Sequence, residues 1–138
     1  MGISSWKSEI KSNLANIRQY QADKAAREED IQRLEKSQRE IKEARKAFRD
    51  IQKSVISATD ETLFWRGNSQ EQYRYHAAYI KAAYRGADTK IGEVLDQIKS
   101  DISNLKKQNN DLIQAIRGLE RRNNRLNDWI ADALRNDG

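Results

Sequence analysis

A row of evenly spaced aliphatic residues runs through the second half of the chain and restricts the folds that it can adopt. From Ile91 to Ala133 the row alternates steps of three and four residues without interruption. Such spacing places every member on one stripe of an α-helix, because a helix turns once in about 3.6 residues. The residues between are mostly charged or amide side chains, so the stripe is as narrow as a coiled-coil contact. This aliphatic row consists of Ile91, Leu95, Ile98, Ile102, Leu105, Asn109, Leu112, Ile116, Leu119, Asn123, Leu126, Ile130 and Ala133.

Upstream of Gly92 the register of the apolar residues changes. Gly86 and Gly92 lower helix propensity there by up to about 1 kcal/mol each, and a four-residue insertion in the repeat locally unwinds a left-handed supercoil. We therefore expect a bend or irregular packing near Gly92. The upstream row consists of Tyr73, Ala77, Ile80, Tyr84, Ala87, Ile91, Val94 and Ile98, and it joins the aliphatic row through one additional four-residue step.

The first half of the chain shows the same periodicity more weakly, with a polar gap between Arg18 and Asp30. Turn-type residues concentrate in 57–68, where Gly67 can end a helix and Asn68 with Glu71 matches a capping box. These patterns predict an all-α fold: a single domain over 1–138, folded as an elongated antiparallel two-helix hairpin with coiled-coil packing. We expect a first helix over about 5–56, a turn over about 57–68 and a second helix over about 69–135. The apolar residues of the first half are Ile10, Leu14, Ile17, Ile31, Leu34, Ile41, Ala44, Phe48, Ile51 and Val55.

The composition excludes most kinds of catalytic and metal site. The 138 residues contain no Cys and one His, which excludes thiol nucleophiles, disulfides and multi-histidine metal sites. The nearest preceding carboxylate to His76 is Glu71, five residues away, which does not suit a catalytic dyad. The sequence has no phosphate-binding loop. We expect a protein that is not an enzyme and that binds no cofactor or metal.

The charge of +5 is spread evenly along the chain. Residues 1–64 carry 13 basic and 11 acidic side chains, and residues 65–138 carry 13 and 10. Nucleic-acid binding requires clustered basic residues, so we expect no nucleic-acid partner. The chain is also too polar for a membrane span, and its first residues lack the apolar run of a signal peptide.

The predicted hairpin leaves part of the aliphatic row without a counterpart. With a turn centred near residue 63, Ser5 faces about residue 121, and Leu126, Ile130 and Ala133 overhang. The polar gap of the first helix similarly lies opposite Ile98, Ile102 and Leu105. An exposed apolar strip usually marks an interaction surface, so we expect a second chain to cover it. The predicted partner-binding residues are Ile98, Ile102, Leu105, Asn109, Leu112, Ile116, Leu119, Asn123, Leu126 and Ile130.

Two groups of residues, one in this row and one near the hairpin tip, each allow two interpretations. Asn109 and Asn123 either fix register and partner choice through hydrogen bonds, or lie at the edge of the row and meet water. Phe64, Tyr75 and Tyr79 either form an aromatic contact patch at the hairpin tip or simply pack locally.

Two long helices joined by a turn with Trp65-Arg66-Gly67 resemble the WXG superfamily of small type VII secretion proteins. The indole can fill the end of the hairpin, and Gly67 permits the reversal. The length, the charged first helix and the extended aliphatic row look more like the YwqH-like branch, small helical companions of LXG-domain toxins. Actinobacterial members of the superfamily often carry Tyr-x-x-x-Asp/Glu just after the second helix as an export signal. The C-terminal residues here lack a tyrosine, and the spacing matches only at Tyr84 and Asp88, in the middle of the second helix.

The resemblance implies a non-enzymatic adaptor that binds the helical N-terminal domain of an LXG toxin and delivers it to the type VII secretion machine. Further partners that fit the sequence are a second small WXG-like protein and a second copy of this chain. The expected location is the cytoplasm of the producing cell, with co-secretion as a further expectation. The alternative function is a structural coiled coil or homo-oligomeric scaffold unrelated to secretion, which would explain the aliphatic row but not a Trp-x-Gly turn in mid-chain.

Overall fold

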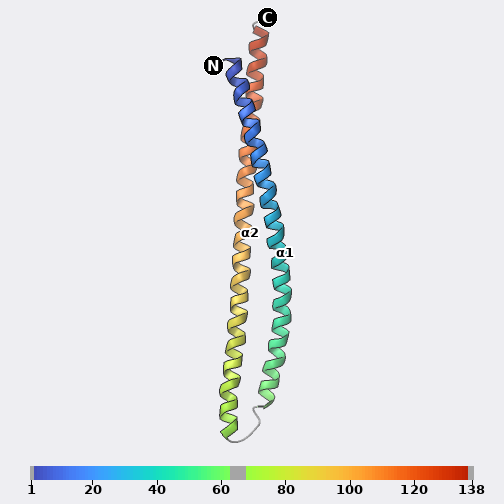
Figure 1. Cartoon of the computed structure of the whole chain (residues 1–138), viewed down its shortest axis with the longest axis vertical. Helices are drawn as coiled ribbons and strands as arrows, with labels where there is room; N and C mark the ends of the chain where they lie inside the picture. The colour runs from blue at the N-terminus through green and yellow to red at the C-terminus, as the bar shows by residue number, and fades with distance from the viewer. Residues whose placement is uncertain (1, 63–67, 137–138) are drawn as a thin grey trace. The chain divides into compact units, whose positions relative to one another are not determined.

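The computed structural model describes two long helices and no strand among residues 2–62 and 68–136, with 59–62, 68–70 and 73 described by their backbone alone. Helix α1 spans Ile3–Thr62 and helix α2 spans Asn68–Asn136. The two helices run antiparallel (Figure 1). The predicted all-α hairpin fold is therefore confirmed. Trp65 and Gly67, the proposed turn motif, lie outside the described residues.

The boundary predicted for the first helix is wrong by about one and a half turns, because α1 continues to Thr62 and not to residue 56. Ser57, Thr59 and Asp60 favour turns, but they reduce helix propensity by only about 0.7 kcal/mol each or less. Neither Gly nor Pro interrupts α1 before its end. The second helix begins and ends within one residue of its predicted limits.

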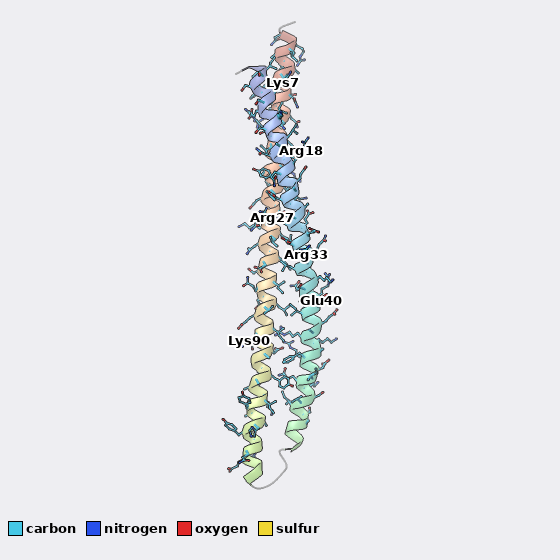
Figure 2. The ribbon with its side chains drawn as sticks, viewed as in Figure 1. Lys7, Arg18, Arg27, Arg33, Glu40 and Lys90 are labelled. Carbon is cyan, nitrogen blue, oxygen red and sulfur yellow. The ribbon has the colours of Figure 1, made fainter. Side chains whose placement is uncertain are left out.

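Contacts divide the hairpin into two compact units, each made of one segment from each helix. Unit 1 comprises Met1–Arg33 and Ile102–Gly138, and unit 2 comprises Leu34–Asp101. In unit 1 the N-terminal part of α1 lies beside the C-terminal part of α2 (Figure 1). In unit 2 side chains of both helices meet between the two ribbons (Figure 2).

A stripe of covered side chains runs along α1 at alternating steps of three and four residues. The polar gap predicted between Arg18 and Asp30 does not interrupt it, because half-buried Tyr20, Lys24 and Arg27 occupy the positions where aliphatic residues are missing. Long side chains can cover an apolar neighbour with their methylenes while the charge reaches water. This α1 stripe consists of Ile3, Trp6, Ile10, Asn13, Ile17, Tyr20, Lys24, Arg27, Ile31, Leu34, Gln38, Ile41, Arg45, Phe48, Gln52 and Val55.

The predicted pairing of the two helices is wrong. It placed Asn13 opposite residue 113, whereas the Asn13 side chain donates a hydrogen bond to Asn123. Because α1 ends at Thr62 and not near residue 56, residues of α1 lie opposite later residues of α2 than predicted. Arg45, for example, binds Asp88 and not residue 81. As a result Leu126 does not overhang but is 0% exposed, and Ile130 and Ala133 are half-buried.

The predicted change of register near Gly92 is also wrong. Leu95 is buried and Val94 is 50% exposed, so the covered stripe of α2 passes through Leu95. Upstream it keeps steps of three and four through Tyr84 and Ala77, because Lys81 and Asp88 fill the positions between them. Of the apolar residues predicted to pack in the first half, Leu14, Ala44 and Ile51 are exposed.

The burial of Leu126 generates a stability prediction. Leu126→Ala should lower the free energy of unfolding by about 2–5 kcal/mol, because it removes a fully buried side chain and leaves a cavity in unit 1. Urea unfolding followed by circular dichroism measures the change. The matched control is Leu134→Ala, which removes the same atoms from an exposed site and should change stability by less than about 0.5 kcal/mol. Equal effects would contradict the packing described here.

Candidate partner-binding surfaces

The predicted partner-binding residues lie on the face of α2 that packs against α1. Ile102, Asn109, Ile116, Asn123 and Leu126 are buried, and the others are half-buried. The prediction that α1 leaves part of this row uncovered is therefore wrong. The half-buried members are Ile98, Leu105, Leu112, Leu119 and Ile130.

Two asparagines of the aliphatic row make polar contacts inside unit 1. Asn13 Nδ2 donates to Asn123 Oδ1 at 2.8 Å, and both side chains are buried. Asn109 Nδ2 donates a longer bond, 3.4 Å, to the backbone oxygen of Lys24. The Oδ1 atom of Asn109 is buried without a hydrogen-bond partner among the described residues. Burial excludes the interpretation that these amides meet water at the edge of the row, and the Asn13–Asn123 pair can fix the register.

An aromatic and ionic cluster closes the end of unit 1. The rings of Trp6 and Trp129 lie 5.7 Å apart, and the Arg122 guanidinium lies 5.0 Å from the Trp129 ring centre. Arg122 Nε also donates to Glu9 Oε1 at 3.1 Å. The sequence analysis missed this cluster because its register paired α1 with the wrong residues of α2. The sequence does indicate this contact, because Trp6 and Trp129 lie near opposite ends of the chain and an antiparallel hairpin brings those ends together.

Unit 2 contains a charged cluster around Asp88. Arg45 Nε donates to Oδ1 at 3.1 Å and Arg49 Nε donates to the same oxygen at 2.9 Å, while the Nη2 atoms of both reach Oδ2 at 3.1 Å. The hydrogen bonds from Arg49 and then Arg45 hold the pKa of Asp88 well below its ordinary value. The same bond to Asp88 raises the pKa of Arg49. Asp88 occupies a position of the α2 stripe, so these charged groups lie within the contact between α1 and α2.

The export-like spacing of Tyr84 and Asp88 has a structural explanation. The Tyr84 ring is half-buried and lies 5.4 Å from the ring of Phe48 on α1. Asp88 is bound by the two arginines described above. Both side chains are therefore engaged in contacts between α1 and α2 within unit 2.

A second apolar surface of unit 2 lies beside the helix contact. Its members immediately precede every second position of the two stripes, and in an antiparallel pair such positions from both helices come to the same edge. The Glu9–Arg122 ion pair in unit 1 joins residues at these positions. Glu40 and Lys90, which precede the stripe residues Ile41 and Ile91, are charged and border this surface. Ile51 and Val94 are 57% and 50% exposed. This apolar edge consists of Ser37, Ala44 and Ile51 of α1 with Ile80, Ala87 and Val94 of α2.

The other predicted site residues lie near the start of α2 or outside the described residues. Tyr75 and Tyr79 are exposed, one turn apart. The Tyr75 ring contacts His76 at 6.0 Å between ring centres. Phe64 lies outside the described residues. Within 2–62 and 68–136 no three His, Asp or Glu side chains are placed to hold a metal ion, and no helix is long and apolar enough to cross a membrane.

The Asn13–Asn123 pair generates a second prediction. Asn123→Leu alone leaves the buried Asn13 amide without its acceptor. We expect the double variant Asn13→Leu/Asn123→Leu to be more stable than this single variant by roughly 1–3 kcal/mol. Chemical denaturation measures the difference. The control Asn136→Leu changes an exposed asparagine and should have little effect. A single variant as stable as the double variant would refute the buried hydrogen bond.

The Asp88 cluster predicts a pH dependence. Because the pKa of Asp88 is lower in the folded than in the unfolded chain, its contribution is complete above the ordinary aspartate pKa of about 3.9 and decreases as pH falls below it. Wild type should therefore exceed Asp88→Asn in melting temperature at neutral pH, and the difference should shrink below about pH 4. Asp132→Asn, which removes an exposed carboxylate bonded to Arg135, should show little difference at any pH. A pH-independent difference for Asp88→Asn would contradict the ionic origin.

Comparison with known proteins agrees with the helical architecture. A family model described as YwqH-like matches residues 6–128, from Trp6 in the closing cluster of unit 1 to the residue before Trp129. Comparison with curated proteins gave no match, and comparison with solved structures gave none. The matched residues include the covered stripes of both helices almost completely. On the extent of that match, the chain belongs to the YwqH-like family.

Proposed function

We propose that this chain is a non-enzymatic companion that binds the helical N-terminal domain of an LXG-type toxin and delivers it to the type VII secretion machine. Family membership supports a small helical protein, and the resemblance of the sequence to companions of LXG toxins supports the partner. In this proposal the protein acts in the cytoplasm of the producing cell and is exported together with the toxin.

The apolar edge of unit 2 is the observation that carries the proposal. The chain is 34% charged, yet none of the six residues of this edge carries a charge. Among the neighbouring outward positions Ala47, Ser54 and Ala83 are uncharged as well, whereas Glu40 and Lys90 place one charge of each sign beside the edge. Burying the exposed parts of Ile51 and Val94 would contribute roughly 1 kcal/mol each. A contiguous apolar surface on a highly charged helix pair is typical of a contact with another protein.

The shape of this edge fits a helix better than a loop or a strand. Its members recur at seven-residue intervals on each helix, which places them in a strip parallel to the helix axes of unit 2. An amphipathic helix could lay its apolar face along such a strip. A partner domain made of helices would thus extend the hairpin of unit 2 into a small bundle, without opening the contact between α1 and α2.

A binding experiment tests this proposal. The full chain is produced together with a protein that is encoded beside it and has a helical N-terminal domain, and the affinity is measured by calorimetry. Ile51→Glu/Val94→Glu should weaken binding at least about tenfold, since each tenfold loss corresponds to about 1.4 kcal/mol. The control Leu14→Glu/Leu134→Glu places the same charges on exposed apolar sites outside the edge and should bind as wild type.

Three outcomes would argue against the proposal. Wild type could bind no neighbouring helical protein, or the control pair could weaken binding as much as the edge pair. The third outcome is a stable homo-oligomer in light scattering that the edge pair disrupts, which would favour a self-associating scaffold.

A further inference from the structure

A second edge of unit 2 is strongly basic. Five exposed cationic residues follow one another along α1 at alternating steps of three and four residues, each one position after a member of the α1 stripe. They span 15 residues, and the first and last lie about 21 Å apart along the helix. Because they lie on the opposite side of the stripe from Ala44 and Ile51, they form an edge separate from the apolar edge. This basic edge consists of Arg39, Lys42, Lys46, Arg49 and Lys53.

Each neighbouring pair along the basic edge has like charge. Residues three and four apart on a helix face one another, and like charges at this spacing destabilise the helix. Arg49 pairs with Asp88, but Arg39, Lys42, Lys46 and Lys53 have no ion pair with any side chain in the described part of the chain. Glu43 and Asp50 lie three or four residues from Arg39, Lys46 and Lys53 and offset part of this charge. The edge therefore keeps a positive surplus that a partner could satisfy.

Side chains of α2 add to the same edge. Arg85 and Lys99 are exposed one position after members of the α2 stripe, and Gly92 occupies the equivalent position between them. A Cβ atom on Gly92 would lie 3.0 Å from Arg45 Nη2, so the missing side chain leaves room for that guanidinium against α2. A hollow of about 380 Å³ opens here, lined by Lys42, Arg45, Lys46, Arg49, Asp50 and Leu95.

We infer that the basic edge docks an amphipathic helix of a partner protein whose carboxylates repeat the heptad spacing of the edge. The cations lie in one line along about four helical turns, which matches a row of carboxylates on a second helix. Leu95 supplies an apolar contact in the hollow, as a helix–helix interface requires. Complementary charge would set both the orientation and the choice of the partner helix.

Two observations favour an acidic helix over nucleic acid. Asp50 lines the hollow and Asp96 is exposed on the facing side of α2, and both carboxylates would repel a phosphate backbone. The basic edge also contains no aromatic residue on which a base could stack. A helix with mixed charge can place a basic residue opposite these aspartates. This inference concerns an edge separate from that of the proposed toxin contact and does not depend on it.

The test uses the full chain and a fluorescent alanine-based helical peptide whose glutamates repeat the spacing of the basic edge. Anisotropy titrations compare it with a shuffled peptide of the same composition. We expect wild type to prefer the spaced peptide by at least about tenfold, and Lys42→Glu/Lys46→Glu/Lys53→Glu to lose at least about tenfold in affinity for it. The control Lys11→Glu/Lys90→Glu/Lys107→Glu has the same net charge but alters exposed lysines elsewhere, and should bind within about twofold of wild type.

Two additional variants test whether the charge of the basic edge itself causes the binding. Lys42→Gln/Lys46→Gln/Lys53→Gln removes the three charges without reversing them, and it replaces the triple glutamate variant if that variant does not fold. We expect it to weaken binding of the spaced peptide as well. Ile51→Glu/Val94→Glu should bind the spaced peptide as wild type, which separates the two edges. Equal binding of the shuffled peptide, unchanged binding by the neutral variant, or equally effective competition by duplex DNA would overturn the inference.

Discussion

The mutual burial of two heptad-spaced stripes is the contact on which the rest of this structure depends. Each helix is too polar to form a core by itself, and much of helical stability in proteins comes from packing of one face rather than from propensity. The stripe of α2 is almost entirely aliphatic from Leu112 to Leu126, where it packs in unit 1. The stripe of α1 is much more polar, so α2 supplies most of the apolar surface and α1 covers it with mixed side chains.

The polar members of the stripes give the pairing its specificity. An aliphatic stripe alone would tolerate a shift of one helix by seven residues, because each heptad offers nearly the same surface. Asn13 with Asn123 in unit 1, and Asp88 with Arg45 and Arg49 in unit 2, make contacts that such a shift would break. A shifted pairing would leave buried amides and charges without partners, which is more costly than losing a hydrophobic contact.

The same contact determines which surfaces remain for other proteins. Once the stripes face each other, the positions directly beside them form two edges of unit 2, and these differ in chemistry. One edge carries Ile51 and Val94 with mostly uncharged neighbours, and the other carries the lysines and arginines of α1. In the two proposals above, one helix pair would distinguish apolar from acidic partner helices by these edges. The evenly spread charge of the sequence hides this separation, because residues three and four apart on one face are interleaved with residues of the opposite face.

The sequence alone was sufficient for the helical class, the two-helix hairpin and the stripe of α2, because periodicity is a local property of one helix. It placed Leu112 and Ile116 correctly on the stripe of α2 that packs against α1. It could not fix the pairing of the helices, since residues 57–62 suit either a turn or a final helical turn. That choice alone moved Leu126 from an expected overhang to full burial and brought Trp6 to Trp129. The tertiary structure also decided that Leu95 and not Val94 is covered, and that Lys24, Arg27 and Asp88 belong to the stripes. Those assignments depend on which side chain lies across the interface, and this information is absent from the spacing within either helix.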